Sequence, residues 1–411
     1  MWVSPGATLS LEGAIDNGGT IFLATGLGAH PPKGDPGYAT LFIGENGVTL
    51  TGGGKIVLGA ANSPDVRIVG DAAQSNLVNI DDTIEGGGQI GEGELALTNG
   101  PGGVIASLDR LTLTLNTGLN IIFNGGLIEA EDASYLAITG FVNNVGGTIA
   151  AVDEGTVTLQ SANISGGTLS TTAGASIIAE GSTLIDPGES SIVNAGLLEG
   201  AGPGWTMIWG AVDNTGTLAV TGGDLLLEGP ITGSGVLQIA NGTAVLDSPF
   251  SEDVRFAGSS GTLGLADSQS YTGTITDFST SGGDTLDLHD IADGSDTTAS
   301  FRGTKAVGVL TVSDGVHTAA LSLVGDYLNS TFALSSDGQG GTLVTDPSTR
   351  TPSTSSAFAT STTQLFLNEM ASIGAAIEGV DRLACAAHFP EGPPALASNH
   401  APMGASQTRI V

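Results

Sequence analysis

Residues 126–169, GLIEAEDASYLAITGFVNNVGGTIAAVDEGTVTLQSANISGGTL, decide the fold, because one short phrase recurs in them at a nearly constant interval. The phrase is a glycine followed by a pair of residues that ends in an aliphatic side chain. Its six instances in the middle of the chain are Gly126-Leu127-Ile128, Gly147-Thr148-Ile149, Gly167-Thr168-Leu169, Gly196-Leu197-Leu198, Gly216-Thr217-Leu218 and Gly235-Val236-Leu237. One step, from Leu169 to Leu198, is long, whereas every other step is close to twenty. A period of about twenty residues is typical of a repeat architecture.

The segments between these glycines have the pattern of strands and turns. Residues 111–115 and 156–159 alternate between threonine and an aliphatic residue, and Asn-Gly, Gly-Gly and Asp-Asn pairs separate such runs. Helical repeats need helix formers at a period of 3.6 residues, which this pattern lacks. One repeat is long enough for a coil of short strands, and coils stack about 4.8 Å apart. The sequence therefore predicts an all-β chain with a parallel β-helix, a solenoid, over residues 1–244.

The composition supports a thin, repetitive core and restricts the partners. The 411 residues include 65 glycines without a collagen period, and 40% are apolar but only 5% aromatic. Val, Ile, Leu and Ala must therefore build the core. With 42 acidic against 10 basic residues, the formal net charge is -32. Such a surface repels nucleic acid and anionic lipid, so we expect no nucleic-acid partner.

Targeting signals and cysteines carry little information about where the chain is located in the cell. The first residues lack the basic and apolar regions of a signal peptide, and no run of about 18 apolar residues predicts a membrane helix. We therefore expect no membrane insertion by this segment, and we expect the chain to be a fragment of a larger exported protein. Cys385 is the single cysteine, so an internal disulfide is excluded.

The length and spacing of the strand patterns change near residue 245. Residues 245–347 contain longer strand patterns separated by turns such as Ser313-Asp314-Gly315, and predict a small antiparallel, sandwich-like domain that caps the solenoid. Residues 348–361 are rich in Ser, Thr and Pro, and predict a linker. Residues 362–380 predict a short amphipathic helix, and the proline-containing residues 381–411 predict a disordered tail.

Asparagines stand close to the repeated phrases. They are Asn17, Asn124, Asn143, Asn144, Asn194 and Asn214. Asparagine tolerates left-handed backbone, so we interpret these residues first as turn formers. Stacked asparagine side chains can also hydrogen-bond along a ladder, and a polar binding ladder is the alternative.

Five segments resemble a known group of proteins. They are LVNIDDTIEGGGQIG (77–91), GDTLDLHDIA (283–292), LTVSDGVHTA (310–319), LVGDY (323–327) and SDGQGGTLVTDP (336–347). Their sequences resemble those of the large, repetitive β-strand-repeat exported proteins of alphaproteobacteria, which are autotransporter-like or adhesin-like passengers. The resemblance covers residues 1–347 and implies a right-handed β-helix, export, and a surface role. The chain after Pro347 does not share it.

Catalysis is not predicted. Carbohydrate-active β-helix enzymes need carboxylates clustered with a basic residue on one face. The pair Asp81-Asp82 lies on adjacent residues that face opposite sides of a strand. Glu129, Glu131 and Asp132 form another acidic group, with no Arg, Lys or His close to it in the sequence. We interpret both groups as solvated turns, and keep a carbohydrate-active enzyme as an alternative function.

Calcium is the chemical alternative. Five aspartates recur at every third position: Asp284, Asp287, Asp290, Asp293 and Asp296. Calcium takes six to eight oxygen ligands from carboxylates and turn carbonyls. Residues 282–288 match half of one calcium-roll repeat, whereas such rolls need consecutive copies. Turn formation explains these aspartates as well, so no cofactor is required, and a calcium-responsive passenger secreted by a type I-like route remains an alternative.

Trp205 and Trp209 are separated so that they share one face of a strand. They predict either a platform on which a carbohydrate stacks or a hydrophobic plug within the long step between Leu169 and Leu198.

Taken together, the sequence predicts a structural and adhesive segment of a secreted or cell-surface protein. Its partners would be host or biofilm surface glycans or proteins.

Overall fold

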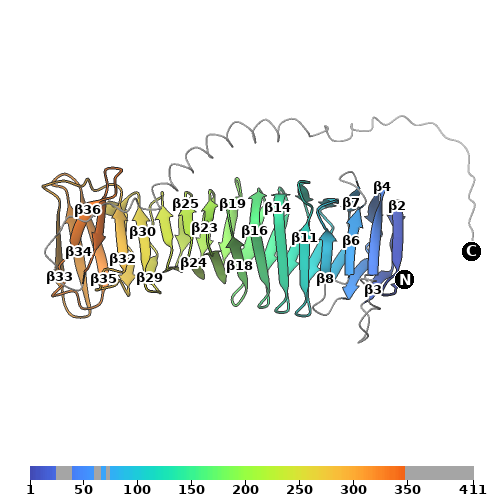
Figure 1. Cartoon of the computed structure of the whole chain (residues 1–411), viewed down its shortest axis with the longest axis horizontal. Coiled ribbons are helices and arrows are strands. Elements are labelled where there is room, and N and C mark those ends of the chain that lie inside the picture. Colours follow the sequence, from blue (N-terminus) through green and yellow to red (C-terminus); the bar gives the residue numbers. More distant parts are fainter. Residues whose placement is uncertain (25–38, 60–65, 71–74, 348–411) are drawn as a thin grey trace, which may run out of the picture. The chain divides into compact units, whose positions relative to one another are not determined.

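The fold is described from a computed structural model, which describes residues 1–24, 39–59, 66–70 and 75–347. These residues form a β-solenoid of about 13 turns, with about 59% strand and essentially no helix (Figure 1). One short 3-10 helix, η1 (Ser268–Ser270), is present. The predicted all-β repeat architecture is therefore confirmed. The predicted linker 348–361, helix 362–380 and tail 381–411 lie outside the described residues.

Each coil has three faces, and strands on one face pair in parallel with those of the next coil. Face 1 contains β1 (Trp2–Val3), β3 (Thr20–Ala24), β5 (Lys55–Gly59), β8 (Thr83–Gly91), β10 (Val104–Ser107), β13 (Leu127–Ala130), β15 (Thr148–Ala151), β17 (Thr168–Thr171), β20 (Ser191–Asn194), β23 (Ala211–Asn214) and β26 (Ile231–Gly233). β8 continues from face 1 into face 2.

Faces 2 and 3 follow in each coil. Four long strands bend and run through both, namely β2 (Thr8–Asp16), β4 (Ala39–Thr51), β14 (Tyr135–Asn143) and β16 (Thr156–Ser165). Face 2 also contains β6 (Val66–Gly70), β11 (Thr112–Asn116), β18 (Ser176–Glu180), β21 (Leu197–Ala201), β24 (Thr217–Thr221), β27 (Val236–Ala240), β29 (Asp253–Phe256) and β31 (Thr274–Thr276). Face 3 also contains β7 (Asn76–Asn79), β9 (Ala96–Asn99), β12 (Ile122–Asn124), β19 (Thr183–Asp186), β22 (Trp205–Ile208), β25 (Asp224–Leu227), β28 (Thr243–Leu246), β30 (Gly261–Leu265) and β32 (Asp284–Leu288).

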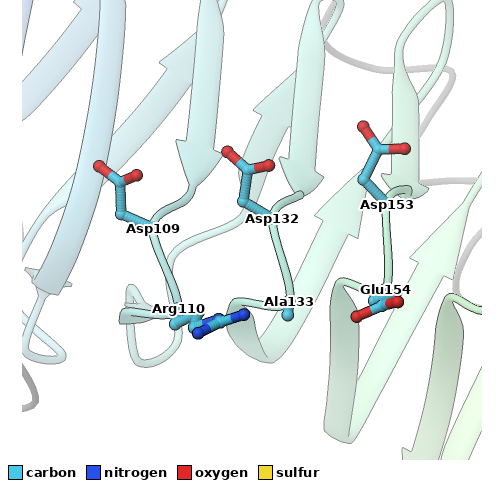
Figure 2. Close-up of a pocket in the computed structure, with 6 residues that line it drawn as sticks. All are labelled: Asp109, Arg110, Asp132, Ala133, Asp153 and Glu154. Atoms are coloured by element: carbon cyan, nitrogen blue, oxygen red, sulfur yellow. The ribbon is translucent and has the colours of Figure 1, made fainter.

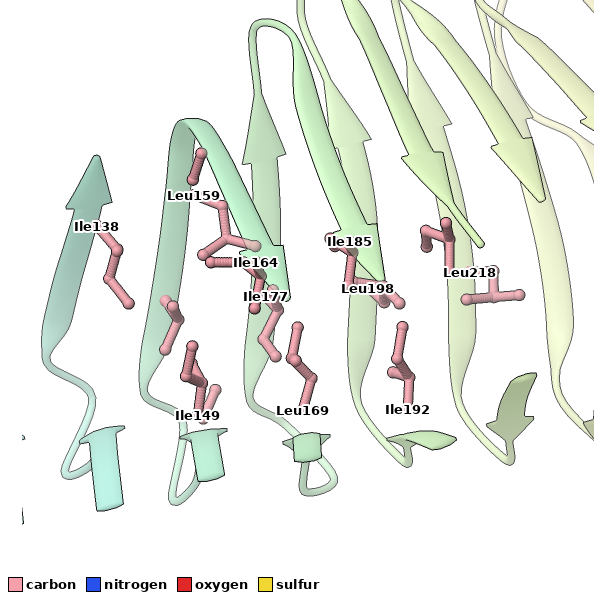
Figure 3. Close-up of a cluster of buried hydrophobic side chains, with 14 of the residues drawn as sticks. Ile138, Ile149, Leu159, Ile164, Leu169, Ile177, Ile185, Ile192, Leu198 and Leu218 are labelled. Carbon is pink, nitrogen blue, oxygen red and sulfur yellow. The ribbon is translucent and has the colours of Figure 1, made fainter. Parts of the chain in front are cut away.

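The core consists of aliphatic side chains that stack in rows along the solenoid (Figure 3). Alternate residues of each strand point inward, and parallel pairing places each inward residue over its equivalent in the neighbouring coil. The row on face 1 is Ile21, Ile56, Ile84, Ile105, Ile128, Ile149, Leu169, Ile192, Val212 and Ile231. Every member is buried. The row needs no aromatic bulk, in agreement with the composition.

The long repeat step has a simple explanation. Leu169 lies on face 1 and pairs with Ile192, whereas Leu198 lies on face 2 and pairs with Ile177 and Leu218. The step from Leu169 to Leu198 was therefore counted between two different faces. Counted on face 1 alone, from Leu169 to its partner Ile192, the spacing is again that of one coil. No hydrophobic plug is needed to fill an oversized coil.

The corner between face 1 and face 2 changes its length along the chain. In the N-terminal half it is a four-residue turn, which we call the wide corner, at residues 108–111, 131–134, 152–155 and 172–175. Further along it is a two-residue turn, the narrow corner, at residues 195–196, 215–216 and 234–235. The strand residue before the wide corner is in turn Ser107, Ala130, Ala151 and Thr171, and before the narrow corner it is Asn194, Asn214 and Gly233.

Most of the asparagines that we interpreted as turn formers belong to two buried ladders. In the first ladder, at the corner between faces 3 and 1, Asn79 Nδ2 donates to Asn99 Oδ1 at 3.0 Å, and the pattern repeats from Asn99 to Asn124 and from Asn124 to Asn144. At its start, Asn17 Nδ2 donates to Asp82 Oδ2 at 2.7 Å.

The second ladder begins beside the last wide corner, at Thr171, and continues at the narrow corners. Thr171 Oγ1 donates to Asn194 Oδ1 at 2.6 Å, and Asn194 Nδ2 donates to Asn214 Oδ1 at 2.7 Å. Both asparagines are fully buried. Asn143 is outside both ladders, because its Oδ1 accepts from the Val145 N–H. The ladders lie within the fold, so their amides bond to one another and to coil carbonyls.

The parallel ladders continue past residue 245, where we expected an antiparallel domain to begin. β28, β30 and β32 pair in parallel on face 3, because Leu246, Leu265 and Leu288 continue the same buried row. The antiparallel pairs involve the strands that follow, namely β33 (Thr298–Gly303), β34 (Val307–Ser313), β35 (Thr318–Val324), β36 (Ala333–Ser336) and β37 (Thr342–Thr345).

These antiparallel strands are joined directly to the solenoid. β35 pairs with β31 on face 2, and β37 pairs with β32 on face 3. Leu310, Leu321 and Val344 from these strands are fully buried. Tyr327 Oη donates to the Phe278 carbonyl at 2.8 Å. A capping role for these strands remains a prediction.

Candidate functional site

The wide corners create a hollow of about 500 Å³ on the surface of the solenoid. It is lined by two rows of residues from three consecutive coils: Asp109, Asp132 and Asp153, with Arg110, Ala133 and Glu154 beside them. Figure 2 shows the three aspartates pointing the same way, one from each coil. The hollow is therefore a repeated acidic surface with one guanidinium group.

The shape of each turn explains this presentation. At the middle turn, Asp132 and Ala133 have φ angles of 54° and 55°, and the Ser134 N–H donates to the Glu131 carbonyl at 3.0 Å. Two left-handed residues inside such a closed turn define type I′. Aspartate adopts this conformation readily, whereas alanine is strained in it. The turn holds the Asp132 side chain away from the core and in line with its equivalents.

Negative charge accumulates around this hollow. Partial burial raises the pKa of the Glu129 carboxyl, and the charges of Glu131 and Asp153 raise it further. The pKa of Glu131 is also raised, first by burial and then by Asp132, Asp153, Glu85 and Asp109. Each carboxyl is thus harder to ionise than an isolated one, first because it is partly buried and then because its neighbours are also acidic.

The side chains of the hollow are mostly carboxylates. Its lining residues include no histidine or lysine, and Arg110 is the one basic residue among them. Repeated carboxylates can hold amines or guanidinium groups of a partner.

Sequence reasoning found part of this site. It singled out Glu129, Glu131 and Asp132 as an acidic group but missed Asp109 and Asp153. A usable signal existed, because Asp109, Asp132 and Asp153 follow one another in step with the repeat, one in each coil. The other acidic group singled out in the sequence, the pair Asp81-Asp82, lies in two different environments. Asp81 Oδ1 accepts from Gly52 N, while the buried Asp82 accepts from Gly54 N.

The five calcium candidates have different surroundings. Asp284 Oδ2 accepts from Ser279 N at 2.7 Å, and Asp290 accepts from Ser268 Oγ and Gln269. Asp287 lies 3.4 Å from His289 Nε2. Asp293 and Asp296 are exposed. Within residues 1–24, 39–59, 66–70 and 75–347, no group of three or more His, Cys, Asp or Glu is arranged to hold a metal ion.

The two tryptophans lie at the two ends of one strand. Trp205 opens β22 and Trp209 follows its end, and the inward residues between them are Thr206 and Ile208. Both indole rings are half-buried on the opposite side. Trp209 Nε1 is buried without a hydrogen-bond partner. A stacking platform therefore remains a prediction.

An apolar surface lies on face 3. Ile121, Phe123 and Phe141 are 44%, 47% and 49% exposed on neighbouring coils, and Val145 is 63% exposed beside them. Residue 122 pairs with residue 142, so the outward side chains of the two strands are neighbours. In the part of the chain that the structure describes, no helix is long and apolar enough to cross a membrane.

Comparison with known proteins gave no relatives: no family model, no curated protein and no solved structure matches this chain.

Proposed function

We propose that the chain is a structural and adhesive segment of a secreted or cell-surface repeat protein, and that it performs no catalysis. The observation that carries the proposal is the uninterrupted stack of parallel coils, which repeats the same outward positions in register. Asp109, Asp132 and Asp153 are one such repeated row. Repetition allows one partner to be held at several points at once, which raises avidity without any deep pocket.

The partner that suits this surface is a glycan or protein on a host or biofilm surface that carries cationic groups. Because the formal net charge of the chain is -32, it attracts cationic partners and repels anionic ones. Arg110 is the one cationic residue among those that line the hollow, so most of the carboxylates there are available to a partner. Such binding should weaken as salt is added.

We also propose the finer features that the sequence resemblance implies. The coil would be right-handed, the strands β33 to β37 would act as a cap, and the chain would belong to a larger exported protein similar to autotransporter passengers. Direct pairing of β35 and β37 with the last parallel strands supports the capping role, because it covers edges that would otherwise be unpaired.

The test is a binding and turnover assay with the full chain. The immobilised chain is presented with an array of cationic, neutral and anionic glycans and with surface proteins, and released sugar products are measured in parallel. We expect saturable, salt-sensitive binding without products. Absence of binding above that of an unrelated acidic protein would contradict adhesion. Product release from polyuronides would instead support the carbohydrate-active alternative.

A matched pair of variants locates the contact. D109N/D132N/D153N removes the carboxylates of the hollow, and D16N/D277N/D296N removes the same charge from scattered exposed sites. We expect the first variant to lose binding and the second to keep most of it. Melting in millimolar calcium separates the calcium-responsive alternative, since an unchanged melting temperature counts against it.

A further inference from the structure

The second asparagine ladder ends on a buried acid. Asn214 Nδ2 donates to Glu252 Oε2 at 2.7 Å. Glu252 is 4% exposed, and its other oxygen, Oε1, is buried without a partner. A carboxyl group in this position is unusual, because burying a charge is costly unless both oxygens are satisfied.

Two glycines make room for this contact. Gly233 takes the place of asparagine in the next coil, since it pairs with Asn214. A Cβ atom at Gly233 would overlap the Asn214 backbone, and one at Gly235 would overlap the Asn214 side chain. The Glu252 side chain therefore reaches back across the coil of β26 and occupies the end of the ladder.

The surroundings of Glu252 disfavour its ionised form. Burial raises the pKa of the carboxyl, and hydrogen bonds from Asn214 and the Gly235 N–H lower it less than burial raises it. The charged groups that act on Glu252 from neighbouring strands, Asp213 and Asp253, are acidic and raise the pKa further. Tyr271 donates to the Glu252 backbone carbonyl and has its own pKa raised, so it adds no charge.

We propose that Glu252 is an acid-closed latch. When its carboxyl is protonated, the coils of residues 211–275 open less readily, and when it ionises they open more readily. A group whose folded pKa is raised contributes stability that is complete below the unfolded pKa, near 4.5, and lost as pH rises through the folded value. The coils next to Glu252 are therefore more easily opened in neutral solution than in mildly acidic solution.

The experiment is hydrogen exchange of the full chain at pH 5 and pH 8, followed by mass spectrometry and corrected for intrinsic rates. We compare peptides from residues 211–275 with peptides from residues 127–194. In the natural chain, protection of the first region should be higher at pH 5, by up to about tenfold for each unit by which the pKa is raised. The second region reports the effect of pH on the rest of the solenoid.

Three variants make the outcome specific. E252Q should remove the part of the pH dependence that Glu252 contributes, because the amide is neutral throughout. The part due to Asp224, Glu228 and Asp247, whose pKa values are also raised by burial, should remain. D253N removes a neighbouring exposed carboxylate and should leave most of the pH dependence in place. N214D places a second carboxyl against Glu252, and should lower protection at pH 8 much more than at pH 5.

The proposal is overturned if E252Q keeps the pH dependence of the natural chain, or if residues 211–275 are equally protected at both pH values. It is also overturned if N214D lowers protection equally at both. Because a buried aspartate at residue 214 titrates by itself, N214D is compared with N214D/E252Q, and equal pH dependence of these two variants also overturns the proposal.

Discussion

The wide and narrow corners occupy the same position of the coil, yet they differ in whether the polar side chains beside them face the solvent or the interior. At the wide corners of residues 131–134 and 152–155 the aspartates point outward and the strand before each corner ends on a buried alanine, Ala130 or Ala151. At the narrow corners after β20 and β23 the strand ends on a buried asparagine, whose backbone carbonyl accepts two N–H groups from the corner of the next coil, as Asn214 does from Ser234 and Gly235. The same position of the coil thus carries an outward acidic row in one region and an internal ladder in the other.

The difference follows from how each turn closes its hydrogen bonds. A four-residue turn closes on itself, as when the Gly155 N–H donates to the Val152 carbonyl at 2.7 Å. At a two-residue turn the N–H groups donate instead to the backbone carbonyl at the strand end of the preceding coil, as Thr215 and Gly216 do to Asn194. The wide corner is consequently available for contact with other molecules, whereas the narrow corner serves the fold.

The largest effect is expected from Asn194→Ala at the narrow corner. Asn194 donates to Asn214 and to the Thr217 carbonyl, and accepts from Thr171. Its loss leaves buried groups without partners, so we expect a cost of about 3 kcal/mol in the free energy of unfolding, measured with urea. Asn116→Ala removes one exposed bond and should cost about 0.5 kcal/mol. Equal effects would show that the ladder contributes nothing special.

The reverse exchange, Ala151→Asn at a wide corner, should cost about 2 kcal/mol, because a buried amide without partners is destabilising. Ala151 is fully buried, and the four-residue turn beside it closes on itself. Its neighbour in the next coil, Thr171, already uses its hydroxyl to donate to Asn194 and to accept from Gly196 N. Ala137→Asn, whose side chain faces outward on β14, serves as the control and should change stability by less than about 0.5 kcal/mol. A neutral Ala151→Asn would mean that asparagine does not require the narrow corner.

Ala133→Gly should stabilise the wide corner by about 0.5–1 kcal/mol, because glycine adopts left-handed backbone freely. Ala133 has a φ of 55°, which an L-residue with a Cβ adopts at a cost. The same substitution at Ala137, in extended backbone, should destabilise by a similar amount. Thermal melting of both variants checks the opposite signs, and a shared sign would contradict the strain.

The smallest effect is expected from E129Q/E131Q. Both carboxyls have raised pKa values, so their contribution to stability is complete below about pH 4.5 and is lost as pH rises through the folded values. The double variant should therefore gain a few tenths of a kcal/mol at pH 7, the scale of exposed charge pairs, and nothing at pH 4. Glu189→Gln, at an exposed turn, provides the comparison. A gain of equal size at both pH values would show that ionisation of these partly buried carboxyls is not its cause.

The periodic part of the fold was predictable because inward aliphatic residues recur with the coil. Ile128, Ile149 and Leu169 were identified in the correct register from their spacing alone. The register between Leu169 and Leu198 was not, because glycine phrases precede strands on more than one face. Spacing reports the length of a coil, whereas it does not report which face a strand joins.

The candidate site was harder to predict, since its residues lie in turns that no apolar period marks. Asp132 was singled out, and Asp109 and Asp153 were missed because neither was considered together with its equivalents in the other coils. The burial of Asn194 was also missed: a turn asparagine and a ladder asparagine have the same local sequence. What separates them is the pairing between distant strands, which places one asparagine inside the coil and the other outside it.

The stacked row from Ile21 to Ile231 has a consequence for how such a chain changes during evolution. Each coil in this row meets the coil before it and the coil after it through nearly the same side chains. Duplication of one coil's worth of coding sequence would therefore insert a unit that already fits both neighbours. Growth and shortening by whole coils demand no compensating changes elsewhere, so length is a trait that selection can adjust independently of sequence.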